Sequence, residues 1–220
     1  MNAAPQPAHG RPQRRALEGR YVRLEPLGPE HAADLYRAAS APGAEQRFRY
    51  LGELLPPRDE TETAAWIARV APVDDPLYFA VIDRATGRAG GEQALMRTVP
   101  EHGVIEIGAI MWGPGIARTR PATEALYLSA RHVFEELGYR RFEWKCNDLN
   151  EPSKAAARRF GFVFEGVFRQ HMIQKGENRD TAWFAMLDRD WPRLKAEYER
   201  WLDPQNFDAA GVQKTKLRFG

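Results

Sequence analysis

The strongest constraint on the fold is a strand, a polar loop and a helix start that occur twice in succession. Residues 104–112 form an apolar, β-rich run that ends at Gly113-Pro114-Gly115. A helix is predicted to begin near Pro121, since proline is favoured in a first helical turn. A second strand over 142–146 and a second helix after Asn150 repeat the arrangement. Two such units predict one shared cofactor cleft.

The loop before the first of these helices predicts an anion site. A helix N-terminus presents free N–H groups and the positive end of the helix dipole. Arg118, Thr119 and Arg120 lie directly before Pro121 and add positive charge. The expected guest is therefore a phosphate.

Three further stretches carry a family resemblance. They run from Ala122 to Leu126 at the helix start, from Glu136 to Arg141 at its end, and from Asn150 to Ala156 before Gly161-Phe162. In this order they resemble the GNAT superfamily of acyl-CoA-dependent N-acetyltransferases, and within it the branch of ribosomal-protein N-terminal acetyltransferases. The resemblance covers the chain from about Arg20 to about Trp191. One departure concerns the pyrophosphate loop, where Arg120 replaces a glycine of the family pattern and Ala117 replaces its leading Gln or Arg, so a variant loop path is expected.

The predicted fold class is α+β, a single GNAT-like domain with a mixed, mostly antiparallel central sheet flanked by helices. The domain is expected over residues 19–202, after a flexible basic arm over 1–18 and before a C-terminal tail over 203–220. Apolar periodicity predicts the remaining elements. They are an opening strand over 21–26, helices from Pro29 and from Arg58, an irregular segment over 41–57, a hairpin over 77–83 and 90–98, a late hairpin over 162–171 and 180–188, and a final helix over 191–202.

Composition narrows the class of protein. With 220 residues and 43% apolar residues, the chain can bury one substantial core. The formal charge of +2 does not require a nucleic-acid partner, and the single cysteine, Cys146, suits a reducing compartment. No apolar run reaches membrane-spanning length, and the first residues lack the apolar core of a secretory signal. The expectation is a cytoplasmic protein without nucleic-acid or membrane partners.

Two carboxylates are candidates for the general base. Glu106 lies among apolar residues on the strand over 104–112, and the resemblance implies that a carboxylate on this strand deprotonates the amine. The structural alternative is that Glu106 faces solvent or pairs with Arg97 on the neighbouring strand. Glu92, on the preceding strand, is the second candidate.

Asn150 and Ser153 form a capping pattern at the second helix. Capping accounts well for the presence of one of these polar residues and less well for the presence of both. The resemblance implies that Asn150 binds the pantetheine arm or a water, and that Ser153 lies near the thioester sulfur as proton donor. Tyr139 and Tyr127 are alternatives for that role. Cys146 is interpreted as a packing residue, since a Cys-His mechanism would need His171 or His132 beside it.

The resemblance also implies binding residues. Main-chain groups of the last part of the 104–112 strand would bind the pantetheine amides, and two loop aromatics would line the acceptor site. Gly108 marks either a bulge in this strand or the close approach of another backbone. The expected cofactor-binding set is Ile110, Met111, Trp112, Arg118, Thr119, Arg120, Ala122, Thr123, Asn150 and Ser153, and the acceptor-binding set is Phe48 and Tyr50. Arg158 and Arg159 are further candidates for the outer phosphates.

The sequence thus predicts an N-acetyltransferase that moves the acetyl group of acetyl-CoA to a primary amine by direct attack in a ternary complex. The acceptor is a protein N-terminus or a small amine, no metal is expected, and a homodimer stays open. The alternative is a catalytically inactive acyl-CoA-binding sensor or regulator. A nucleotide-phosphate binder is disfavoured, because neither a Walker nor a Rossmann glycine pattern occurs.

Overall fold

The computed structural model describes residues 6–219, and in these residues the chain forms a mixed eight-stranded sheet. The strand order is β1-β2-β3-β4-β5-β6-β8-β7, in which only β5 and β6 are parallel neighbours. This confirms the predicted α+β class. The strands are β1 (Leu17–Glu18), β2 (Val22–Pro26), β3 (Leu77–Asp83), β4 (Arg88–Val99), β5 (Val104–Trp112), β6 (Arg141–Asn147), β7 (Val163–Gln174) and β8 (Glu177–Leu187).

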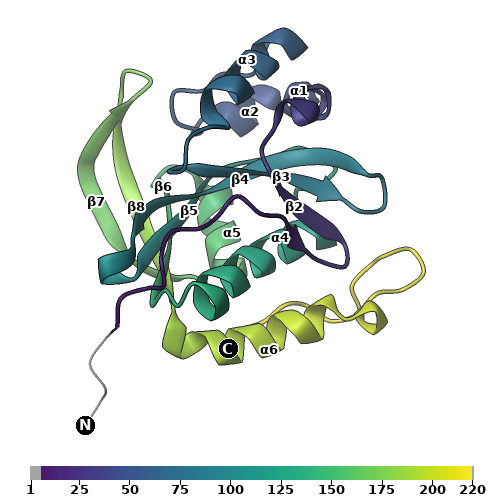
Figure 1. Cartoon of the computed structure of the whole chain (residues 1–220), viewed down its shortest axis with the longest axis vertical. Helices are drawn as coiled ribbons and strands as arrows, with labels where there is room; N and C mark the ends of the chain where they lie inside the picture. The colour runs from purple at the N-terminus through teal and green to yellow at the C-terminus, as the bar shows by residue number, and fades with distance from the viewer. Residues whose placement is uncertain (1–5, 220) are drawn as a thin grey trace.

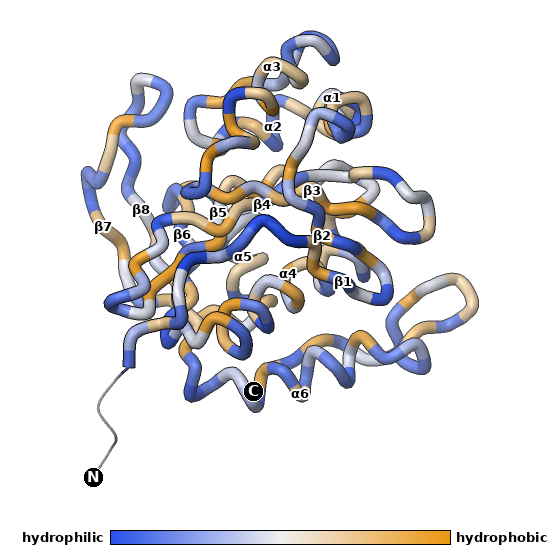
Figure 2. The backbone as a smooth tube through the Cα atoms, viewed as in Figure 1, coloured by the Kyte–Doolittle hydropathy of each residue, from blue (hydrophilic) through white to orange (hydrophobic). Residues whose placement is uncertain are grey.

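Helices cover both faces of the sheet (Figure 1). One face carries α1 (Ala32–Ser40), α2 (Ala44–Phe48) and α3 (Glu60–Val70), and the other carries α4 (Arg120–Arg131), α5 (Glu151–Arg159) and α6 (Trp191–Leu202). The larger core lies under α4 and α6, where Leu126, Phe142 and Tyr198 are fully buried. Apolar residues concentrate along β3 to β5, whereas the peripheral loops are mostly hydrophilic (Figure 2). None of the helices in residues 6–219 has the length and apolar character needed to cross a membrane.

Local sequence signals explain the element boundaries. Asp59 caps α3, because its carboxylate accepts a hydrogen bond from the backbone N–H of Glu62 at 2.8 Å. Pro121 occupies the first turn of α4 as predicted. The late hairpin turns through Lys175 and Gly176, whose φ angles of 51° and 75° match the left-handed pair of a tight two-residue turn.

A bulge in β5 and the early end of its pairing with β6 position the site. Between the pairs Ala94↔Gly108 and Glu92↔Met111, two residues of β5 oppose one of β4, and Ala109 takes a φ of 48°. The predicted irregularity at Gly108 is therefore a β-bulge. Register pairs with β6 extend only to Ile107↔Trp144, so the last residues of β5 leave one backbone edge open.

Three segments differ from the expectations. Residues 6–18, expected as a flexible arm, lie along the domain. There Leu17 is buried, and the backbone N–H of Ala8 bonds to the Pro100 carbonyl; residues 1–5 lie outside the described part. Residues 41–57 contain the short helix α2, anchored by the buried Phe48. The tail beyond Asp203, expected to be loosely held or packed on a neighbouring molecule, packs back on the domain through the apolar side chain of Phe207.

Candidate active site

A cleft of about 480 Å³ opens where β5 and β6 separate. Its walls bring together residues that are far apart in the sequence: Glu106 and Ile110 from β5, Asn150 and Ser153 at the start of α5, and Tyr50 from the loop after α2. All five are among the predicted site residues. The cleft therefore joins the proposed catalytic groups to one side of the expected acceptor site.

Glu106 is buried at 4% exposure and held by two cations. Its carboxylate lies 2.9 Å from Lys145 Nζ and 3.1 Å from Arg97 Nη1. Lys145 also pairs with Glu143 at 2.7 Å and lies over the Trp183 ring at 3.9 Å. The pairing with Arg97, which was the structural alternative to a role as base, is present, and Lys145 is a second partner that the sequence did not reveal.

Ser153 faces sulfur in this cleft. Its hydroxyl accepts a hydrogen bond from the Trp144 indole N–H at 3.0 Å, which leaves its own hydrogen free to donate. The nearby acceptor is Cys146, a buried free thiol. Burial raises the pKa of that thiol, and the Ser153 hydrogen bond opposes the rise. The Ser153 hydroxyl thus already lies in hydrogen-bonding reach of one sulfur atom.

Asn150 is the N-cap of α5, as the capping pattern predicted. Its side-chain oxygen accepts from the backbone N–H of Ser153 at 3.2 Å. Within residues 6–219 its side-chain NH₂ group has no hydrogen-bond acceptor, although the residue lines the cleft. Capping therefore uses only half of the amide and leaves its donors for a ligand.

A second cleft, of about 810 Å³, lies over the loop before α4. Arg118, Thr119, Arg120 and Ala122 line it together with Trp112 of β5. No side chain caps the N-terminus of α4, so its first N–H groups face this cleft without a side-chain acceptor.

The polar side chains of this loop have different surroundings. Arg118 is exposed, with a φ of 64°, while the Thr119 hydroxyl bonds to the Ile116 carbonyl at 2.6 Å. Arg120 lies between two aromatic rings, 4.1 Å from the centre of Tyr21 and 4.4 Å from that of Phe207. Arg118 is accordingly the loop arginine whose charge is most available.

Thr123 is fully buried and does not face the cleft directly. Its hydroxyl accepts a hydrogen bond from Arg159 Nη1 at 3.1 Å. Arg159 itself lines the cleft, and burial lowers the pKa of its guanidinium. Arg158, the other candidate on this helix, instead lies over the Phe184 ring at 5.4 Å.

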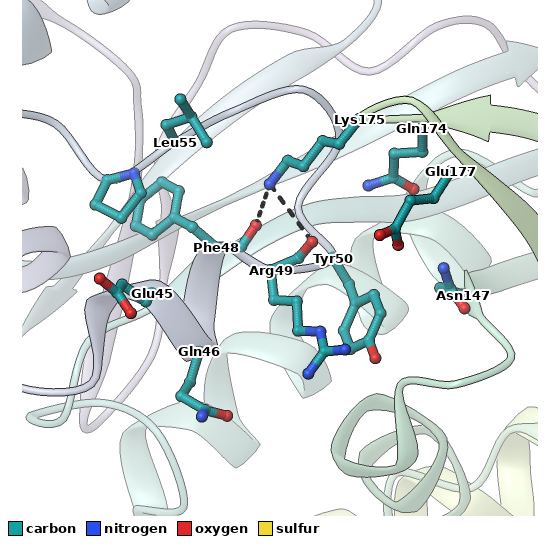
Figure 3. Close-up of a pocket in the computed structure, with 11 residues that line it drawn as sticks. Glu45, Gln46, Phe48, Arg49, Tyr50, Leu55, Asn147, Gln174, Lys175 and Glu177 are labelled. Carbon is teal, nitrogen blue, oxygen red and sulfur yellow. Dashed lines mark hydrogen bonds between the residues drawn. The ribbon is translucent and has the colours of Figure 1, made fainter.

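The two predicted acceptor residues, Phe48 and Tyr50, line a third pocket of about 450 Å³ (Figure 3). Lys175 from the β7–β8 turn closes this pocket by donating to the Phe48 carbonyl at 2.6 Å. Phe48 is 5% exposed and packs with Ala39 and Met111, so its ring mainly belongs to the core. Tyr50 lines both this pocket and the Glu106 cleft.

Met111 also faces a separate cavity of about 330 Å³ between the sheet and helices α1 and α3. Glu92 of β4, the second candidate base, lies in its wall and is 4% exposed. Burial raises the pKa of Glu92 well above its ordinary value. No hydrogen-bond partner for Glu92 Oε2 is present in the described part of the chain.

Several site residues escaped the sequence analysis. Lys145, Arg179 and Trp144 line the Glu106 cleft, while Phe207 and residues 211–213 of the tail line the cleft over α4. Lys145 lies on the predicted strand over 142–146, between the apolar residues Trp144 and Cys146. This alternation of a polar with two apolar side chains was the only local signal that could have drawn attention to Lys145. The tail residues carried no comparable signal, because their contact with the cleft is purely tertiary.

Comparison with known proteins agrees with this geometry. The family model described as "Acetyltransferase (GNAT) domain" matches residues 22–163. A GCN5-related N-acetyltransferase from Brucella melitensis is 55% identical, with 96% of this chain and 95% of that chain covered and a TM-score of 0.93. A probable GNAT acetyltransferase from Chromobacterium violaceum is 39% identical, with 87% and 95% covered and a TM-score of 0.78.

More distantly related structures show similarity of the fold alone. RimL, a ribosomal L7/L12 α-N-protein acetyltransferase in complex with coenzyme A, is 18% identical, with 79% of this chain and 99% of that chain covered and a TM-score of 0.64. No curated protein matches the sequence. The family model and the Brucella relative cover most of the chain, and the chain belongs to the GNAT acetyltransferase family.

Proposed function

We propose that this GNAT acetyltransferase transfers the acetyl group of acetyl-CoA to a primary amine by direct attack in a ternary complex. The observation that carries the proposal is the single cleft that joins Glu106, Asn150 and Ser153 to the open edge of β5. No covalent enzyme intermediate is needed, because a neutral amine is itself the nucleophile. We also propose that the protein belongs to the branch of ribosomal-protein N-terminal acetyltransferases, which the motif resemblance supports.

The residues fit acetyl-CoA. The uncapped start of α4 and the exposed Arg118 offer donors and positive charge for phosphates. Beyond Ile107, the backbone of β5 has an unpaired edge facing β6, which suits the amides of a pantetheine arm. Ile110 and Met111 lie on that edge, while Trp112 packs against Phe160 at 6.1 Å and walls the cleft over α4.

The bound cosubstrate supplies an activated thioester carbonyl, and the chain supplies proton handling. Ser153, whose oxygen already accepts from Trp144, donates its hydrogen toward the departing sulfur. The amide NH₂ of Asn150 hydrogen-bonds the pantetheine arm or a water. Glu106 accepts the proton of the attacking amine, directly or through water, while Lys145 and Arg97 hold its carboxylate in place.

The two cations around Glu106 also support the alternative function. A carboxylate engaged by both Lys145 and Arg97 has fewer lone pairs free for an amine. A catalytically inactive acyl-CoA-binding sensor would keep the cofactor clefts and need no free base.

The first test is calorimetric titration of the protein with acetyl-CoA and with CoA at fixed salt, followed by an amine panel with thiol-release detection. The proposal expects micromolar acetyl-CoA binding and amine-dependent thiol release. Binding without release across the panel would favour the sensor. Absence of binding to either ligand would refute both functions.

A further inference from the structure

The cavity between α1, α3 and the sheet holds a carboxyl group that the proposed mechanism does not use. Its walls are mainly apolar and include Leu35, Phe48, Trp66 and Met111. Glu92 is the buried ionisable group in this wall, and its Oε2 has no hydrogen-bond partner within residues 6–219. A buried carboxyl without a partner is costly, so its retention points to a ligand that completes it.

The charged groups around Glu92 do not neutralise it. Tyr78 of β3 lies close enough that Glu92 contributes to raising its pKa to about 12, after the effect of burial. Glu62 and Arg69 of α3 and Glu53 of the loop line the cavity without a hydrogen bond to Glu92. A cationic group entering the cavity would therefore find Glu92 as its buried counter-ion.

The cavity adjoins the Glu106 cleft. Glu53, Leu54, Trp66 and Arg69 line both spaces, so the two are direct neighbours that share a wall. Glu92 is also the cross-strand partner of Met111, which lies on the open edge of β5. An amino group at Glu92 therefore lies at the level of the sheet where the pantetheine arm is proposed to run.

We infer that this cavity is the acceptor pocket and that it selects a primary amine with an apolar, preferably aromatic, body whose amino group binds Glu92. The inference rests on the proposed function, because it names the substrate class of that reaction. About 330 Å³ accommodates about ten non-hydrogen atoms at the ~30 Å³ that each water occupies in the liquid. The amine enters as an ammonium and Glu92 releases its proton to solvent. For attack, one N–H bond of the ammonium breaks, the proton forms an O–H bond on Glu92, and the nitrogen lone pair becomes free. Glu106 accepts the second proton, which the nitrogen loses once its bond to the acetyl carbon has formed.

The test is calorimetry with 2-phenylethylamine and its uncharged counterpart 2-phenylethanol, on the wild type and on Glu92→Gln, in two buffers of different ionisation enthalpy. The wild type is expected to bind the amine saturably and to release a proton. Glu92→Gln is expected to weaken amine binding by about thirtyfold or more and to abolish the proton release, with the alcohol little affected.

A second variant guards against misfolding of Glu92→Gln. Ala65 lines the cavity from an exposed position of α3, so Ala65→Phe should obstruct the cavity and weaken binding of both compounds. Ala68→Phe is the matched control, because Ala68 is exposed on the same helix and does not line the cavity.

Two results overturn the inference: no saturable amine binding by the wild type, or equal weakening of amine and alcohol in Glu92→Gln. Titration with acetyl-CoA alone keeps the two proposals separate. Normal acetyl-CoA binding with amine-dependent thiol release, but without selection of apolar amines, refutes the acceptor pocket and leaves the proposed function standing. If the wild type does not bind acetyl-CoA at all, the proposed function is refuted.

Discussion

Replacing Glu92 with glutamine should change how the stability of the protein depends on pH. Burial raises the pKa of the Glu92 carboxyl well above its ordinary value of 4.5. The folded protein therefore keeps a proton that the unfolded chain releases as the pH rises past that value. The stabilisation due to this proton is complete at low pH and is lost as the pH rises through the folded-state pKa.

The magnitude follows from one proton. Between the ordinary pKa of 4.5 and the raised folded-state pKa, the unfolding free energy of the wild type should fall by about 1.4 kcal/mol per pH unit relative to Glu92→Gln. Glutamine carries no titrating proton, so the variant lacks this slope. Because the amide has its own burial cost, the slope and not the absolute difference is the prediction.

Urea denaturation of both proteins at several pH values measures this slope. Glu62→Gln serves as a control of opposite sign, because the backbone N–H of Arg58 lowers the pKa of Glu62. The stability from Glu62 is present above the ordinary pKa of 4.5 and is lost as the pH falls through the folded-state pKa. Parallel curves for the wild type and Glu92→Gln across this range would refute the buried, unpartnered state of Glu92.

Three further predictions concern the cofactor cleft, the base and the core. Arg118→Glu should weaken acetyl-CoA binding about tenfold or more in calorimetry, since Arg118 is the exposed loop arginine beside the α4 N-terminus; unchanged affinity would remove the phosphate assignment. Glu106→Gln should lower kcat about a hundredfold while acetyl-CoA affinity stays the same, and undiminished kcat would exclude Glu106 as base. Lys145→Met should lower the free energy of unfolding by about 3–5 kcal/mol in urea denaturation, because it removes the buried ammonium between Glu106 and Glu143. A loss of unfolding free energy below about 1 kcal/mol would show that the two carboxylates do not depend on Lys145.

Local signals made much of the fold readable from the sequence. Strand β5 and helix α6 have the bounds that alternation and helical periodicity predicted, and Pro121 and Asn150 occupy the helix starts where their chemistry suits them. These features depend on residues within a few positions of one another. The short helix α2 was missed, since it depends on Phe48 packing against Ala39 and Met111.

The site was only partly readable for the same reason. Asn150, Ser153 and Glu106 carry local signals, and the sequence placed them on the correct elements. The partners that define their chemistry come from other strands: Lys145 reaches Glu106 across the parallel β5–β6 pair, and Arg120 stacks on Phe207 of the tail.

The sequence by itself thus determined most of the strands and helices, the helix start near Pro121 and the candidate carboxylates, because periodicity, capping and turn chemistry act over short distances. Only the tertiary structure decided that Glu106 is held between two cations and that Glu92 faces an apolar cavity without a partner. Burial and charge pairing depend on which distant segments pack against a side chain, and the register and packing of the folded sheet set those neighbours.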